Sequence, residues 1–192
     1  MKPFQFAPLL GFLCLPLFAA EVDPRVLEVM RKEQITAQSF CFSFAQGGLR
    51  NGRNVAEKCT SFAAGRYFGN MKIAEKMPKT ELGGGIIFHA HDEFCAEVGK
   101  FTQPGDSVRD NCDTWNRSRM ELFELGTTDG APASQISAKI DEVEGDHRRF
   151  CQSLRNAGDP GDGSIFRSRI AQCFALVKLS TASDRAIFLG DF

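Results

Sequence analysis

The sequence lacks the usual motifs of catalysis and of bound metals or nucleotides. It contains no Gly-x-Ser-x-Gly nucleophile elbow, no phosphate-binding loop, no His-Glu-x-x-His pair and no calcium-binding loop. No two cysteines have the Cys-x-x-Cys spacing that is typical of zinc sites and redox enzymes. We therefore expect a protein that is not an enzyme and that uses no catalytic residue, cofactor or metal.

Long apolar runs and long runs of one charge are also absent. The longest apolar run, from Leu9 to Phe18, is far shorter than the roughly 20 residues that a membrane-spanning helix needs. The 23 basic and 24 acidic residues are interspersed, so no polybasic arm forms. These features predict no membrane span and no nucleic-acid partner.

Tyrosine and tryptophan occur once each, whereas phenylalanine occurs 18 times. A phenylalanine ring has no polar group and suits a dry interior. The composition therefore favours an aromatic core over an aromatic binding surface.

The N-terminus has the pattern of a secretory signal peptide. Lys2 precedes the apolar run, and the small residues Ala19 and Ala20 precede Glu21. We expect a signal peptide of about residues 1–20, cleaved after Ala19 or Ala20, and one exported domain, 21–192. An uncleaved anchor or a buried N-terminal helix is the alternative.

A short pattern built around cysteine occurs three times. Each copy begins with Phe-Cys, continues through a glycine-bearing turn to a second cysteine, and is apolar again three residues later. The copies begin at Phe40-Cys41, Phe94-Cys95 and Phe150-Cys151. We interpret the chain as three degenerate repeats, roughly 22–79, 86–126 and 133–180, followed by a tail, 181–192.

Removal of Cys14 with the signal peptide leaves six cysteines, which normally pair in an oxidising compartment. A duplicated unit should contain both cysteines of its own disulfide. Each first cysteine is therefore expected to pair with the second cysteine of the same repeat. The predicted disulfides are Cys41–Cys59, Cys95–Cys112 and Cys151–Cys173. Zinc ligation or a reactive thiol is the alternative.

Apolar residues recur at helical spacing in all three repeats. The clearest stripe consists of Ile136, Ile140, Val143, His147, Phe150 and Leu154. We expect Asp23-Pro24 to begin the first helix, Asn54 to cap the second, and Asp106 or Ser107 to cap the fourth. Gly83-Gly84-Gly85 is interpreted as a hinge. The prediction is an all-α protein, about six helices forming three disulfide-stapled hairpins packed into one bundle-like domain.

His89, His91 and Asp92 form the only cluster with metal-binding residue types. On a helix, residues two apart point in nearly opposite directions, so His89 and His91 cannot share an ion there. His91 also lies four residues before its cysteine, as His147 does. We therefore interpret His91 as a packed core residue, with a metal ligand or catalytic base as alternatives.

Asn116-Arg117-Ser118 is an acceptor sequence for an N-linked glycan. Its neighbour Trp115 lies on the cysteine-bearing face, which is expected to turn Asn116 partly outward. Glycosylation of Asn116 is therefore possible in an exported protein.

These observations favour a secreted, non-enzymatic, cysteine-rich helical protein that binds an extracellular protein or glycan. Two alternatives remain open. The Phe-rich hairpins could enclose a cavity and carry an apolar small molecule or lipid, or a metal-dependent enzyme could use His89, His91 and Asp92.

Overall fold

The computed structural model describes residues 22–46, 51–78, 81–101, 107–158 and 163–192, and these contain six α-helices and no strand. The helices are α1 (Pro24–Ala45), α2 (Gly52–Ala74), α3 (Gly84–Phe101), α4 (Val108–Gly126), α5 (Ala133–Ala157) and α6 (Gly163–Leu189). The predicted all-α class is confirmed. In the described part of the chain, no helix combines the length and the apolar character needed to cross a membrane.

The predicted helix starts are partly confirmed. Asp23 caps α1, because its Oδ1 accepts a hydrogen bond from the backbone nitrogen of Arg25 at 2.8 Å, and Pro24 is the first helical residue. The prediction for Asn54 is wrong: α2 begins at Gly52, so Asn54 already lies in its first turn. Ser107 precedes α4 but makes no capping side-chain hydrogen bond, and Asp106 lies outside the described residues.

The predicted glycine hinge is also wrong, since Gly84 and Gly85 are the first residues of α3. A Cβ atom on Gly84 would lie 2.9 Å from Cε1 of Phe123, so glycine lets the start of α3 approach α4 closely. The segment 181–192 is not a separate tail, because α6 continues through Leu189.

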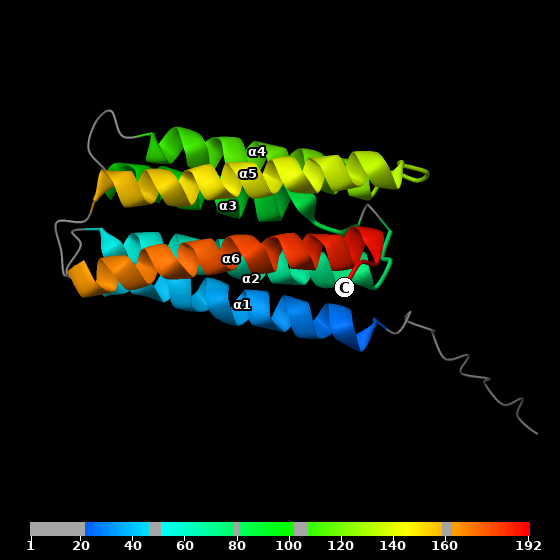
Figure 1. The fold of residues 1–192 in the computed structure, drawn as a ribbon, viewed down its shortest axis with the longest axis horizontal. Helices are drawn as coiled ribbons and strands as arrows, with labels where there is room; N and C mark the ends of the chain where they lie inside the picture. Colours follow the sequence, from blue (N-terminus) through cyan, green and yellow to red (C-terminus); the bar gives the residue numbers. More distant parts are fainter. Residues whose placement is uncertain (1–21, 47–50, 79–80, 102–106, 159–162) are drawn as a thin grey trace, which may run out of the picture.

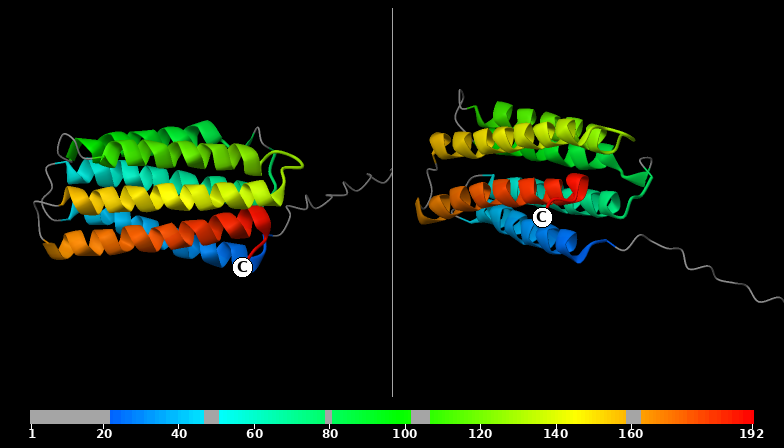
Figure 2. Two further views of the ribbon diagram at one scale, coloured as in Figure 1. Left: turned by 45° about the horizontal axis from the view of Figure 1, so that its top comes forward. Right: turned by 45° about the vertical axis from the view of Figure 1, so that its right-hand side comes forward.

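The six helices form a closed ring. Each helix packs against its neighbours in chain order, and α6 closes the ring against α1. Figures 1 and 2 show the ring flattened into two layers, with α3, α4 and α5 in one layer and α1, α2 and α6 in the other. The last residues of α1, α3 and α5 lie at the same end of the bundle, so the three hairpins point in one direction (Figure 1).

Each hairpin contains one disulfide, and the predicted pairing is confirmed. The bridges are Cys41–Cys59, Cys95–Cys112 and Cys151–Cys173, with Cα atoms 5.2, 5.4 and 5.7 Å apart. All six cysteines are at most 1% exposed. They belong to one continuous core that runs through all three hairpins, so the disulfides fasten a shared interior.

Candidate functional site

One helical turn away from the disulfides lies a layer of aromatic rings and imidazoles. His147 stacks on Trp115, with ring centroids 3.8 Å apart, and His91 stacks on Phe62 at 4.0 Å. His91 also meets the edge of Trp115 at 4.4 Å. Both histidines are 1% exposed, so His91 is a packed core residue, as the repeat predicts.

Burial keeps both imidazoles neutral. Loss of hydration and, to a smaller extent, the positive charge of Arg66 lower the pKa of His91 to about 3, while Asn116 acts in the opposite direction. Burial likewise lowers the pKa of His147 well below its ordinary value, with smaller contributions from Arg66, His91 and Arg148. A general base works best when its pKa lies near the working pH, so neither imidazole suits that role at neutral pH.

The residues of the predicted metal cluster do not converge. His91 points into the bundle, whereas His89 and Asp92 are exposed on the outside of α3. In the described residues, the groups of potential ligands that do converge are different ones. They are His91 with Cys95 and Cys112, and His147 with Cys151 and Cys173, each with ligand atoms within 4.8 Å of one another.

The next layer of the interior holds charges that the sequence did not reveal. Arg66 forms an ion pair through Nε with Glu33, and its Nη2 lies 3.0 Å from Oδ1 of Asp184. The same Nη2 donates to the carbonyl oxygen of Ser180 at 3.3 Å, and the Ser180 hydroxyl donates to Glu33 at 2.8 Å. All four residues are at most 6% exposed, so this network joins α1, α2 and α6 inside the bundle.

The two carboxyl groups of the network keep Arg66 charged despite its burial. Burial alone would lower the pKa of Arg66, but Asp184 and Glu33 outweigh it and the pKa is raised. Burial raises the pKa of Asp184 to about 6, with Arg66 opposing this change and Glu33 adding to it. At neutral pH Arg66 therefore carries its charge between carboxylates that have lost their contact with water.

A small cavity adjoins this network. Its volume is about 10 Å³, which is room for about one water molecule. It is lined by Met30, Glu33, Gln34, Ala37, Phe62, Arg66, Tyr67, Asn70, Trp115, Leu176 and Ser180. Nδ2 of Asn70 has no hydrogen-bond partner. A lipid or drug-sized ligand needs hundreds of cubic ångströms, so this cavity gives the apolar-carrier hypothesis no support.

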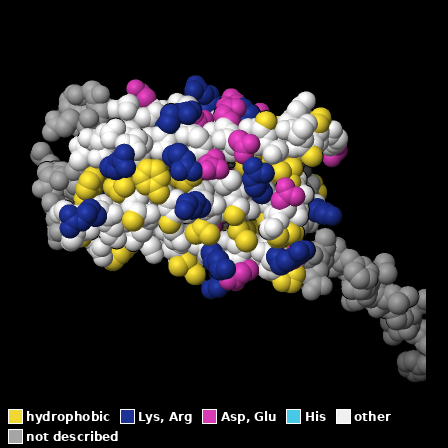
Figure 3. Space-filling view, viewed as in Figure 1, with side chains coloured by type: hydrophobic (Ala, Val, Ile, Leu, Met, Phe, Trp, Pro, Cys, Tyr) yellow, Lys and Arg dark blue, Asp and Glu magenta, His cyan; other side chains and the backbone are white. Residues whose placement is uncertain are grey.

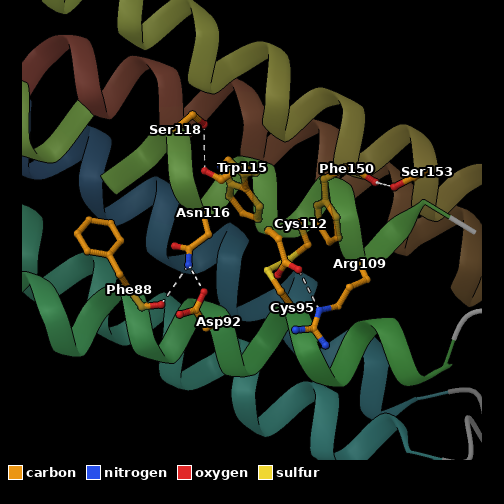
Figure 4. Close-up of a disulfide and its surroundings, with 11 residues drawn as sticks. Phe88, Asp92, Cys95, Arg109, Cys112, Trp115, Asn116, Ser118, Phe150 and Ser153 are labelled. Atoms are coloured by element: carbon orange, nitrogen blue, oxygen red, sulfur yellow. Dashed lines mark hydrogen bonds and ion pairs between the residues drawn. A yellow bond between two sulfur atoms is a disulfide. The ribbon is translucent and has the colours of Figure 1, made fainter. Parts of the chain in front are cut away.

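Asn116 does not turn outward as expected. It is 6% exposed, and its Nδ2, the atom to which a glycan would be attached, donates to the carbonyl oxygen of Phe88 at 3.2 Å and to Oδ1 of Asp92 at 2.5 Å (Figure 4). Trp115 and Asn116 occupy adjacent positions on the buried side of α4. A glycan replaces one of the two hydrogens on Nδ2, so one of these hydrogen bonds would be lost and a sugar would have to fit at a 6% exposed side chain; the folded structure therefore argues against a glycan at this residue.

The three hairpins differ in their balance of acidic and basic residues. Helices α3 and α4 contain seven acidic and four basic residues, whereas α1 and α2 contain three acidic and seven basic, and α5 and α6 five acidic and eight basic. Figure 3 shows Lys and Arg side chains gathered over α5 and α6 around a band of hydrophobic side chains. The middle hairpin is therefore acidic between two basic ones.

A surface groove of about 800 Å³ runs along the acidic hairpin. Its apolar wall includes Phe88 and Phe123, whose rings meet edge to face at 5.5 Å, and the 39% exposed Met120. Its carboxylates come from Asp92, Glu121 and Glu124. Glu121 is paired with Lys139 at 2.8 Å, while no described basic side chain pairs with Asp92 or Glu124.

A second groove, of about 690 Å³, lies between α1 and α2. It contains Ile35 and Phe42, which are 50% and 62% exposed and two helical turns apart on one face of α1. Its carboxylate is Glu57. This groove is more neutral than the groove of the α3–α4 hairpin.

No known protein family, curated protein or solved structure matches this chain.

Proposed function

We propose that the protein is a secreted, non-enzymatic binding protein whose α3–α4 groove receives a positively charged segment of an extracellular protein. The observation that carries this proposal is the contrast among the three copies of one hairpin. They share a disulfide and a buried stripe, yet among their described helices only those of the middle copy have more acidic than basic residues, and its groove has three carboxylates where the α1–α2 groove has one. Surface features that differ between copies of one scaffold are the natural place for function.

The groove has the chemistry of a recognition surface. Phe88, Phe123 and Met120 offer apolar contact area, and Asp92 and Glu124 offer negative charge without a basic partner. An opposite charge on a partner raises the rate of association and fixes its orientation, while apolar contacts slow dissociation. A segment that carries both Lys or Arg and an apolar side chain fits this combination.

The rigidity of the scaffold supports the same function. Three disulfides hold the hairpins, and the groove has few degrees of freedom to lose when a partner binds. The disulfides also fit an oxidising, extracellular environment. Together with the signal-like N-terminus, they support secretion.

The groove is tested by a matched pair of charge reversals. The exported protein is screened against extracellular proteins and glycans, and each partner found is remeasured by biolayer interferometry with Glu124→Arg and Glu57→Arg. Because Glu57 is also exposed in a groove but on α2, both variants change the net charge equally. We expect Glu124→Arg to weaken binding roughly tenfold, mainly through slower association, and Glu57→Arg to change it less than about twofold.

Equal weakening by both variants would mean that total charge attracts the partner and that the α3–α4 groove is not the site. Binding that neither variant changes, or that increasing salt leaves unaffected, would also contradict the proposal, because attraction between exposed charges is screened by salt.

Secretion has its own test. Expression of the full chain in a secreting eukaryotic cell should place the protein in the medium, and N-terminal sequencing should find Ala20 or Glu21 as the first residue. Retention of residues 1–19 in the exported protein would contradict the cleaved signal peptide.

A further inference from the structure

Two of the three disulfides have a buried imidazole beside them. His91 lies one helical turn before Cys95 on α3, and Cys112 reaches the pair from α4. His147, Cys151 and Cys173 repeat this arrangement on α5 and α6. In each trio, one imidazole nitrogen and both sulfur atoms lie within 4.8 Å of one another.

The imidazoles have hydrogen-bonding capacity that the fold leaves unused. Neither nitrogen of His91 makes a hydrogen bond of good geometry, although the side chain of Asn116 lies close enough to raise its pKa, and Nε2 of His147 has no partner; both side chains are 1% exposed. A buried polar atom without a partner is costly and calls for an explanation. Stacking on Phe62 and Trp115 explains the position of the rings but leaves these nitrogens unsatisfied.

The remaining hairpin provides a natural comparison. Its cysteines, Cys41 and Cys59, form the same bridge, but Ala37 stands where the other two hairpins have histidine. The α1–α2 hairpin therefore offers two sulfur atoms and no imidazole.

Two thiolates and one imidazole are an established ligand set for zinc. Zn²⁺ binds sulfur at about 2.3 Å and imidazole nitrogen at about 2.0–2.1 Å, and a Cys₂His set leaves a fourth position for water. Two thiolates neutralise the charge of the ion, which lowers the cost of placing it in a dry interior. Reduced cysteines in these trios are thus matched to Zn²⁺ in kind, number and charge.

We propose that, after reduction of their disulfides, the α3–α4 and α5–α6 hairpins each bind one Zn²⁺ through His91, Cys95 and Cys112 and through His147, Cys151 and Cys173, whereas the α1–α2 hairpin binds none. Two molecules of a small thiol reduce each disulfide, form one disulfide between themselves, and leave two protonated cysteines. Zn²⁺ then displaces both thiol protons and binds the two thiolates and one neutral imidazole nitrogen. The same sulfur atoms form a covalent staple when oxidised and a metal site when reduced.

Counting bound zinc tests the proposal. The full chain, carrying Cys14→Ser in every sample to remove the seventh thiol, is reduced with a phosphine and mixed with Zn²⁺. A weak chelator then removes loosely held ions, and native mass spectrometry counts the rest. We expect two Zn²⁺ in the reduced protein and none in the oxidised protein.

Three variants identify the ligands. His91→Phe and His147→Phe keep a ring for stacking but remove the nitrogen, and each should reduce the count from two to one. Loss of a ligand should weaken zinc binding more than the 10- to 100-fold that loss of an outer-shell partner costs. Ala37→His supplies the missing imidazole beside Cys41 and Cys59 and should raise the count to three.

Several outcomes would overturn the proposal. A count of three in the unmodified protein, or of two in both Phe variants, would mean that thiol pairs bind zinc without histidine. If reduction unfolds the bundle, circular dichroism tests whether zinc refolds it. Zn²⁺ should restore the helical signal in the unmodified protein but not in the His91→Phe/His147→Phe double variant. Absence of both binding and restoration contradicts the inference.

Discussion

The α1–α2 and α3–α4 hairpins have a disulfide at the corresponding position, with Cα atoms 5.2 and 5.4 Å apart. Their buried residues nevertheless differ at positions one and two helical turns away from the cysteines. Ala37 in α1 corresponds to His91 in α3. Arg66 in α2 corresponds to Arg119 in α4, since each lies seven residues after its cysteine. Only Arg66 has carboxylate partners, because Glu33 in α1 corresponds to Ile87 in α3.

This comparison separates what the scaffold requires from what each hairpin adds. The cysteines and the apolar residues beside them recur because every hairpin must close and pack in the same way. The ion-paired network of Arg66, Glu33 and Asp184 lies where α1, α2 and α6 meet, and the groove with three carboxylates lies along α3 and α4. The repeat therefore carries stability, and the binding surface that we propose lies where its copies differ.

The largest expected effect comes from breaking the buried network. Arg66→Met removes the cation between Glu33 and Asp184 and leaves two carboxylates without a counter-charge in the interior. We expect the free energy of unfolding, measured by urea denaturation at pH 7, to fall by about 3–5 kcal/mol.

Arg119→Met is the matched control at the corresponding position of α4. Nη1 of Arg119 has no hydrogen-bond partner, and the guanidinium carbon lies 5.9 Å from the centre of the Phe62 ring. With no carboxylate left unpaired, this change should cost less than about 1.5 kcal/mol. Equal costs for the two variants would contradict the distinction between the hairpins.

The sequence was sufficient to predict the helices and the disulfides because both depend on patterns within one repeat. The helical spacing of the buried face is visible from neighbouring residues alone, such as Phe150, Cys151 and Leu154. The disulfide partner of Cys151 is simply the next cysteine along the chain, Cys173. Even His91 could be assigned to the core, since His147 occupies the corresponding position.

The buried network was not predicted, because its members are distant in sequence. Glu33 lies 33 residues from Arg66, and Asp184 lies 118 residues from it, so only packing of α6 against α1 and α2 brings them together. The sequence nevertheless contained a hint of buried charge. Glu33 lies between Met30 and Ala37 on the buried face of α1, and Arg66 and Arg119 each lie seven residues after the second cysteine of their repeat. The end of α6 was missed because the segment from Ser180 to Asp184 has a loop-like composition, although Ser180 and Asp184 belong to the buried network.

The second largest effect is the loss of stability on removal of one disulfide, and this loss should be nearly the same in all three hairpins. Replacement of one cysteine pair by alanine, for example Cys95→Ala with Cys112→Ala, should lower the free energy of unfolding by roughly 3 kcal/mol. The bridges span 18, 17 and 22 residues, so chain entropy predicts costs that differ by only about 0.2 kcal/mol. Urea denaturation of the three double variants measures this, and one cost that exceeds the others by more than about 1 kcal/mol would show that the hairpins do not share a scaffold equally.

The smallest effect concerns pH and distinguishes the histidine-bearing hairpins from α1–α2. The folded-state pKa values of His91 and His147 lie below the ordinary value of 6.5, so the folded protein takes up these protons later than the unfolded chain. Their contribution to stability is present above pH 6.5 and is lost as the pH falls below it, toward about 3 for His91, at up to about 1.4 kcal/mol per pH unit for each histidine. Asp184 acts in the opposite direction, because its raised pKa of about 6 means that its protonation on acidification favours the folded state.

His147→Phe tests this balance without removing the stack on Trp115. Between pH 7 and pH 5, the free energy of unfolding of the unmodified protein should fall, since two histidines outweigh one carboxylate. The variant should lose less stability over the same interval, because burial lowers the pKa of His147 and one such group contributes at most about 1.4 kcal/mol per pH unit. If His147→Phe and the unmodified protein have parallel stability curves, the buried imidazole of α5 is not what makes this bundle sensitive to acid.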